Sequence, residues 1–199
     1  MRKIIYLISP SKIDENFYFK LNRVLSFGNC AFFQLRLKNI KKNKILKIAK
    51  RVKKITSKHK VKFLINDSFK LAIKAKADGC HLGQLDEPMN IARKKLKKRI
   101  FGITCHNSKS LALNALKYKP DYLAFGSFHK SKLKPKAVKA KLSILKWAKK
   151  IIKKPIVVIG GINNKNYKKL LNHGANYIAL SSYIWNNRIL KPHEAIRKF

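Results

Sequence analysis

The chain has 199 residues, 46% of them hydrophobic, which suits one domain with a full core and is short for two. Its 48 Lys and Arg residues outnumber its 8 Asp and Glu residues, so the formal net charge is +40. The basic residues are scattered along nearly every segment, without an arginine-rich arm or a nucleic-acid-binding module, as in solvated helix exteriors. The sequence therefore argues against a specific nucleic-acid partner. Such a charge would still attract polyanions and small phosphorylated substrates.

The N-terminus and the cysteines indicate the cellular compartment. The apolar run Ile4–Ile8 is much shorter than a signal-peptide core or a membrane-spanning helix. Cys30, Cys80 and Cys105 are widely spaced and odd in number, so neither a disulfide framework nor a zinc site is predicted. We therefore expect a cytoplasmic protein without a membrane partner, in which the thiols are reduced and packed.

Apolar, β-branched segments alternate with lysine-rich segments along the whole chain. The predicted strands are Lys3–Ser9, Ala31–Lys38, Lys62–Asp67, Gly79–Gln84, Arg99–His106, Asp121–Phe128, Pro155–Gly161 and Ala175–Ser182. Helical patterns lie at Lys41–His59, Phe69–Ala75, Asn90–Lys97, Ser108–Lys117, Ala140–Lys153 and Asn164–His173, and Tyr183–Phe199 closes the chain. This alternation predicts parallel strands joined by crossover helices.

Eight such units favour an α/β fold with a single (βα)₈ TIM barrel over residues 1–199. The alternative is an open, doubly wound sheet with a nucleotide site. No GxGxxG or GxxxxGK[ST] loop follows the first predicted strand, and this counts against the open sheet. Barrels of this kind carry their chemistry at the carboxyl ends of the strands, so polar residues at those ends are the candidate site.

The second predicted strand has a polar face. Gln34, Arg36 and Lys38 alternate with apolar residues, so the three share one side of the strand. Strands of a parallel barrel are normally apolar on both faces. Either this strand is an edge strand with one solvent-exposed face, or the three side chains form an anion-binding site. We favour the anion-binding site.

Asp67 ends the third predicted strand and Asp86 follows the fourth, in a chain with only 8 acidic residues. Two carboxylates together with amide and water oxygens suit Mg²⁺, whose coordination is often completed by substrate phosphate. We therefore predict a magnesium site. The alternative is that both carboxylates cap loops or pair with the surrounding lysines.

The last two predicted strands end in small residues. Gly160 and Gly161 end the seventh strand, and Ser181 and Ser182 end the eighth, each just before a helical pattern. Backbone N–H groups at such positions bind phosphate, and the loops after strands seven and eight are the usual phosphate site of this barrel. The glycine pair by itself is equally typical of a turn.

The histidines and cysteines do not suggest a nucleophile or a zinc site. His81 lies within a strand and is predicted to be a satisfied interior residue, whereas the roles of His106 and His129 are left open. The chain has no HExxH spacing and no GxSxG elbow. Covalent catalysis by the protein is therefore not expected.

Four segments resemble the signature runs of the thiamine-phosphate synthase family, in the same order: Gln34–Lys38, Leu64–Asp67, Asp78–Asp86 and Ile159–Asn163. The resemblance covers nearly the whole chain. It implies an enzyme that condenses hydroxymethylpyrimidine diphosphate with a thiazole phosphate and releases pyrophosphate. It further implies a dissociative substitution assisted by Mg²⁺.

The resemblance also assigns roles to particular residues. Those implied to bind the pyrimidine diphosphate are Gln34, Arg36, Lys38, Asn66, Thr104 and Lys134. Those implied to bind the thiazole phosphate are Ser131, Gly161, Ser181 and Ser182, and those implied to hold Mg²⁺ are Asp67 and Asp86. Thr104 stands where the family usually has serine, and it keeps the hydroxyl group.

The chain departs from the family pattern after the sixth predicted strand. Ser127 replaces a proline and Leu133 replaces a hydroxyl residue. The related thiazole tautomerases carry a catalytic histidine at the place of Ser127 and often lack the acidic pair. Here the acids are present and the nearest histidine, His129, lies two residues away from that position, so the synthase is favoured.

A tautomerase-like isomerase and a non-catalytic ligand-binding barrel are the alternatives. The sequence leaves open which thiazole phosphate is used and whether the barrel is a homodimer.

Overall fold

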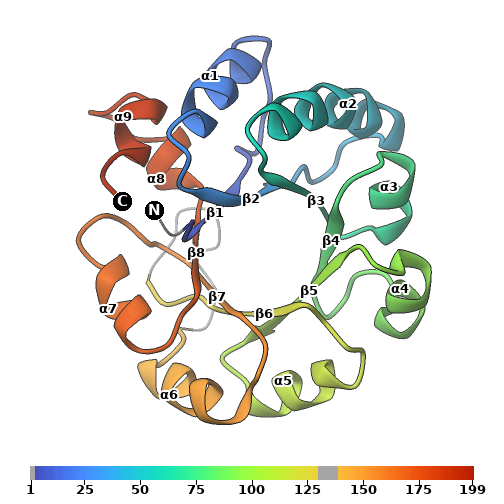
Figure 1. Ribbon diagram of the computed structural model, residues 1–199, viewed down its shortest axis with the longest axis vertical. Helices are drawn as coiled ribbons and strands as arrows, with labels where there is room; N and C mark the ends of the chain where they lie inside the picture. The colour runs from blue at the N-terminus through green and yellow to red at the C-terminus, as the bar shows by residue number, and fades with distance from the viewer. Residues whose placement is uncertain (1–2, 130–138) are drawn as a thin grey trace.

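The computed structural model describes residues 3–129 and 139–199. The strands form one closed parallel barrel, in which each pairs with its neighbour in sequence and β1 pairs with β8. In chain order they are Ile5–Ile8, Cys30–Leu35, Lys62–Asn66, Gly79–Leu82, Ile100–His106, Tyr122–Gly126, Ile156–Ile159 and Tyr177–Leu180, labelled β1 to β8. Figure 1 shows the strands around the centre and the helices outside them. The predicted TIM barrel is confirmed. The open sheet and the edge-strand alternative for the second strand are wrong, because a closed barrel has no edge.

Helices follow the strands in order. They are Asn16–Leu25, Lys42–Lys58, Phe69–Lys74, Met89–Leu96, Lys109–Leu116, Leu142–Ile151, Tyr167–Asn172, Ser182–Trp185 and Pro192–Ile196, labelled α1 to α9. The closing segment of the chain forms two short helices, because Asn187 Oδ1 accepts the backbone N–H of Ile189 and Leu190 and Pro192 then begins α9. Across the ranges given above, no helix has the length and apolar character needed to cross a membrane.

Helix α1 was not among the predicted elements. Its buried residues Phe17, Leu21, Val24 and Leu25 recur at helical spacing. The carboxylate of Asp14 accepts the backbone N–H of Phe17 at 2.7 Å, which supports the first turn. Both features are present in the sequence and could have revealed this helix.

The strands separate two apolar layers. Every second side chain packs outward against the helices, as Ile5 and Leu7 of β1 do. The intervening side chains, including Tyr6, Leu64 and Tyr122, fill the barrel interior. The same alternation turns the polar residues Gln34, Asn66, His81 and Thr104 inward, on strands whose alternate residues lie in the outer layer. The barrel therefore holds a polar cluster above an apolar interior.

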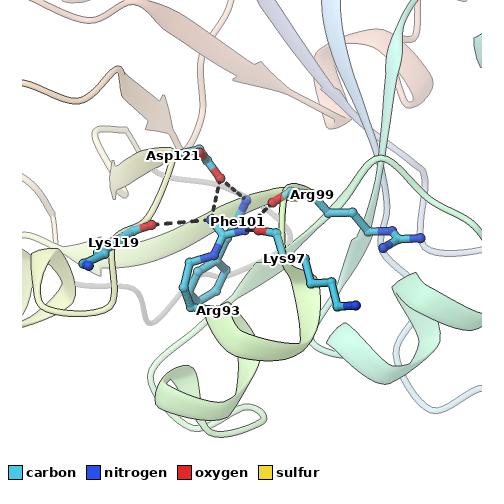
Figure 2. Close-up of polar contacts among 6 residues, drawn as sticks. All are labelled: Arg93, Lys97, Arg99, Phe101, Lys119 and Asp121. Carbon is cyan, nitrogen blue, oxygen red and sulfur yellow. Dashed lines mark hydrogen bonds and ion pairs between the residues drawn. The ribbon is translucent and has the colours of Figure 1, made fainter.

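Arg93 joins the end of α4 to the beginnings of β5 and β6 (Figure 2). Its guanidinium donates to the carboxylate of Asp121 at 3.0 Å and to the carbonyl oxygen of Arg99 at 2.6 Å. It also donates to the carbonyl oxygen of Lys97. The Asp121 carboxylate accepts the backbone N–H of Phe101 at 2.8 Å. This cluster lies at the amino ends of the strands, where a barrel carries stability rather than chemistry.

We expect Arg93→Ala to lower the free energy of unfolding by about 1–3 kcal/mol, because it removes charge-assisted hydrogen bonds to the Asp121 carboxylate and to three carbonyl groups, those of Lys97, Arg99 and Lys119. Catalysis should be unchanged below the melting transition. Lys94→Ala, at the exposed neighbouring position of α4, is the matched control. Urea denaturation of both variants measures the difference, and equal stabilities would contradict this role for Arg93.

Candidate active site

Two pairs of predicted site residues meet at the carboxyl ends of β2 and β3. Gln34 Nε2 donates to Asn66 Oδ1 at 3.1 Å, and the Gln34 residue is only 2% exposed. Just beyond them, the Lys38 ammonium forms an ion pair with the Asp67 carboxylate. Asp67 has a φ of +66°, a left-handed conformation that few non-glycine residues adopt and that is often found at functional sites. The strand pairing thus brings four predicted residues together.

Arg36 lies at the same carboxyl-end rim of the barrel, and its backbone is hydrogen-bonded to Ser9, which follows β1. Its backbone N–H donates to Ser9 Oγ at 2.9 Å, and the Ser9 N–H donates to the carbonyl oxygen of Gln34 at 2.9 Å. Within residues 3–129 and 139–199, the guanidinium makes no ion pair with a carboxylate. A fixed backbone with an uncommitted guanidinium suits Arg36 to binding an anionic ligand.

Asp86 follows β4 and lies close to Asp67. Its Oδ2 accepts the backbone N–H of Gly83 at 2.6 Å. Burial raises the pKa of the Asp86 carboxyl, the hydrogen bond from Gly83 lowers it, and the neighbouring Asp67 raises it. The two acids are therefore near enough to share a ligand.

The donor set fits Mg²⁺. Among the residues that the structure describes, no three or more His, Cys, Asp and Glu side chains cluster as a metal site. A structural zinc centre is thus not indicated there. Mg²⁺ is usually held by one or two carboxylates, with waters and substrate phosphates completing its shell. Asp67 and Asp86 match that pattern.

His81 lies behind this rim, inside the barrel. One ring nitrogen is 2.9 Å from the hydroxyl of Tyr122 and the other is 2.7 Å from that of Thr104. Gln84 Nε2 donates to the carbonyl oxygen of Thr104. The prediction of a satisfied interior histidine is confirmed. Sequence reasoning missed Tyr122 as a partner, although a tyrosine at an inward-facing strand position needs a place for its hydroxyl group.

The ends of β7 and β8 have the backbone features of a phosphate site. Gly160 and Gly161 have φ values of +107° and +57°. A Cβ at Gly160 would lie 1.9 Å from Ser127 Oγ, so glycine lets β7 end against the loop after β6. The backbone N–H groups of Gly161 and Ser182 donate to no residue that the structure describes. Ser181 Oγ donates to the carbonyl oxygen of Ser9 at 3.2 Å.

Residues 127–129, which follow β6, are held by hydrogen bonds to backbone carbonyl oxygens. Ser127 Oγ donates to the carbonyl oxygen of His129 at 2.8 Å, and the His129 N–H donates to that of Gly160 at 3.1 Å. Burial lowers the pKa of His129, and Lys139 and Lys169 lower it further. Ser131, Leu133 and Lys134 lie outside the described residues, so their roles stay predictions.

The three cysteines occupy packed positions. Cys30, Cys80 and Cys105 are all buried and form no disulfide. Burial raises the pKa of Cys30 and of Cys105 to about 12, so both stay protonated near neutral pH. The expectation of packed thiols is confirmed.

The comparisons with known proteins agree with this geometry. The family described as thiamine monophosphate synthase matches residues 5–184. The thiamine-phosphate synthase of Pelagibacter ubique is 56% identical over 99% of this chain and 96% of its own length. That of Erythrobacter litoralis is 38% identical, covering 92% of this chain and 88% of its own.

A solved structure gives the same result. The thiamine phosphate pyrophosphorylase from Pyrococcus furiosus superposes with a TM-score of 0.85 and 26% identity, covering 98% of this chain and 93% of that one. A superposition of this quality over nearly all of both chains shows that the two proteins share one fold. The chain therefore belongs to the thiamine monophosphate synthase family and is an enzyme, a transferase of thiamine biosynthesis.

Proposed function

We propose that this barrel condenses hydroxymethylpyrimidine diphosphate with a thiazole phosphate, releasing pyrophosphate and using Mg²⁺ as its cofactor. The observation that carries the proposal is the meeting of Gln34 with Asn66 and of Lys38 with Asp67 on one rim, beside Arg36 and Asp86. Family membership supports the same activity. The enzyme would act in the cytoplasm on phosphorylated small molecules.

The two amides suit the pyrimidine ring. Gln34 uses one Nε2 hydrogen for Asn66, which leaves its other amide hydrogen and its carbonyl oxygen for a ligand. An aminopyrimidine presents both donors and acceptors along one edge. A buried amide that is already positioned by its neighbour can pair with that edge at little cost in conformational entropy.

The cations suit the leaving group. The C–O bond of the substrate breaks with its electron pair departing on pyrophosphate, and the thiazole nitrogen forms the new C–N bond to the cationic methylene carbon. Arg36, Lys38 and Lys134 would bind the pyrophosphate oxygens and stabilise the developing charge. Mg²⁺ held by Asp67 and Asp86 would neutralise further negative charge on the phosphates. No general base is required for this step.

The thiazole phosphate would lie across the barrel mouth, against the ends of β7 and β8. We assign to it the backbone N–H groups at Gly161 and Ser182, together with Ser181 and Ser131. The uncommitted N–H groups and the left-handed glycine pair support this assignment.

A crystal soaked with pyrophosphate and Mg²⁺ tests the proposed site. We expect pyrophosphate beside Arg36 and Lys38, with a metal ion in contact with Asp67 and Asp86. Pyrophosphate bound elsewhere on the lysine-rich surface, with no metal at the acidic pair, would contradict the proposal.

The tautomerase-like alternative depends on His129, the histidine of the loop after β6. Its lowered pKa keeps the imidazole neutral near pH 7, so it adds no positive charge for a leaving pyrophosphate. The hydrogen bonds named above for residues 127–129 involve the His129 backbone and not its imidazole ring. We therefore expect His129→Ala to retain coupling activity within about threefold of wild type, since no proton transfer is required of it. Steady-state rates at pH 7 provide the check, and a loss on the order of 10²-fold or more, which is typical of removing a general base, would favour the alternative.

A further inference from the structure

A buried chain of hydrogen bonds runs through the barrel interior to Thr104. The hydroxyl groups of Tyr6 and Tyr122 are 2.8 Å apart, Tyr122 is 2.9 Å from His81 Nδ1, and His81 Nε2 is 2.7 Å from Thr104 Oγ1. Tyr6 and Tyr122 are each 2% exposed. The chain thus links strands β1, β6, β4 and β5 and ends at a residue of the proposed pyrophosphate site.

The hydrogens of this chain can point in two directions. If each donor points toward Thr104, the Tyr6 hydroxyl donates to Tyr122, Tyr122 donates to His81 Nδ1, and His81 Nε2–H donates to Thr104. Every buried hydrogen then has an acceptor, and the hydroxyl hydrogen of Thr104 remains for a ligand. In the reverse direction Thr104 donates to His81, and the Tyr6 hydroxyl hydrogen is left over.

The structure favours the first direction. In residues 3–129 and 139–199, Tyr122 is the one recorded hydrogen-bond partner of the Tyr6 hydroxyl. The reverse direction would therefore bury an O–H group without an acceptor, which is unfavourable. A doubly protonated His81 would also leave the Tyr6 hydroxyl hydrogen without an acceptor. Both ring nitrogens would then donate, so Tyr122 would have to donate to Tyr6. Burial also raises the pKa of both tyrosines, so each keeps its hydrogen.

We propose that Tyr6, whose hydroxyl group can donate only to Tyr122 among the described residues, fixes the direction of all the hydrogen bonds in this series. It thereby holds His81 in the Nε2–H tautomer and leaves the Thr104 hydroxyl hydrogen pointing toward the leaving pyrophosphate. This rests on the proposed function. His81 and Tyr122 are positioning residues that act through Thr104. Thr104 donates a hydrogen bond and keeps its proton, so no group-transfer step is added.

The surroundings are shaped to hold this chain. Gly102, in the middle of β5, leaves the room that Tyr122 occupies: a Cβ there would lie 1.9 Å from Tyr122 Cζ and 2.2 Å from its hydroxyl oxygen. The carbonyl oxygen of His81 accepts the backbone N–H of Asp67 at 2.8 Å. This series of hydrogen bonds therefore lies beneath the rim, and His81 is hydrogen-bonded directly to the backbone of Asp67, one of the predicted magnesium ligands.

The tautomer of His81 can be measured without substrate. In protein labelled with ¹⁵N-histidine, long-range ¹H–¹⁵N spectra distinguish a nitrogen that carries hydrogen from one that does not. We expect His81 in the wild type to have a protonated Nε2 and an unprotonated Nδ1 at neutral pH. The opposite tautomer, or two protonated nitrogens, would overturn the proposal whether or not the proposed function holds.

Substitutions then test whether the chain acts through Thr104. Tyr122→Phe removes the donor to His81 Nδ1, so the tautomer should become mixed and kcat for thiamine phosphate formation should fall about tenfold, with little change in KM. Thr104→Val should lose on the order of 10²-fold, and Thr104→Ser should stay near wild type. The double variant Tyr122→Phe/Thr104→Val should be no slower than Thr104→Val alone. Fully additive losses would overturn the proposal.

Two further measurements separate positioning from a loss of folding or of the proposed function. Tyr177→Phe is the matched control, because Tyr177 packs in the same interior cluster and no hydrogen bond of its hydroxyl is recorded among the described residues. It should leave both the His81 tautomer and the rate unchanged.

Binding of inorganic pyrophosphate with Mg²⁺ can be measured by calorimetry and needs no turnover. Tyr122→Phe should weaken it several-fold, and unchanged binding together with unchanged rate would overturn the proposal.

Discussion

Arg36→Ala is expected to slow the formation of thiamine phosphate by a factor on the order of 10²–10³, which corresponds to about 2.7–4 kcal/mol of lost transition-state stabilisation. The reason is that the Arg36 guanidinium makes no ion pair with the described carboxylates, so its charge is available to the pyrophosphate as the C–O bond breaks. A contact that strengthens in the transition state affects kcat more than KM.

The measurement is the steady-state rate of pyrophosphate release with both substrates and Mg²⁺ present. Arg23→Ala, which removes an exposed arginine of α1 on the outside of the barrel, is the control for loss of overall charge. It should be close to wild type. Arg36→Lys should be more active than Arg36→Ala, since lysine restores the positive charge but lacks the planar guanidinium group. An Arg36→Ala enzyme with nearly normal kcat would show that the leaving group is bound elsewhere.

Asp67→Asn and Asp86→Asn should each abolish Mg²⁺-dependent turnover while the barrel stays folded. Each replacement keeps the size of the side chain and removes the charge that a divalent cation requires. In Asp86→Asn the amide oxygen can still accept the N–H of Gly83, so the local turn should survive. In Asp67→Asn the Lys38 ammonium loses its ion-pair partner, and only a partly exposed contact is lost.

Rates measured over a range of Mg²⁺ concentrations, together with thermal melting, test this expectation. Asp14→Asn is a suitable control, because Asp14 is not among the predicted site residues and the new amide oxygen can still accept the N–H of Phe17 at the start of α1. Near-normal activity in both site variants would remove the magnesium hypothesis, whereas melting of both at a much lower temperature would assign the pair a structural role.

The barrel was predictable because its signal is repeated. Each strand is a short apolar run, and most of the segments between the strands are lysine-rich, so one unclear unit does not change the assignment. Helix α1 was missed because it has only two basic residues, Lys20 and Arg23, and so lacks the lysine-rich pattern that marks a helix such as α2. The closing segment was harder, since the turn at Asn187 depends on a side chain that binds the backbone two and three residues ahead.

The candidate site was partly predictable for a similar reason. The period of two placed Gln34, Arg36 and Lys38 on one face, and strand order placed Asp67 beside them. Which partners they take depends on the strand register: Gln34 pairs with Leu64, so its amide reaches Asn66 diagonally. The hydrogen bonds from Tyr6 to Thr104 connect β1 with β4, β5 and β6 between residues 23 to 116 positions apart, and no local sequence pattern indicates such a network.

The central claim is that the purified enzyme makes thiamine phosphate in a Mg²⁺-dependent reaction. The most direct measurement supplies hydroxymethylpyrimidine diphosphate, thiazole phosphate and Mg²⁺, and follows both products. We expect thiamine phosphate and pyrophosphate to form in equal amounts, and neither to form when the metal is chelated. Absence of thiamine phosphate, together with isomerisation of a thiazole carboxylate phosphate that His129→Ala stops, would contradict the synthase assignment and support the tautomerase-like alternative.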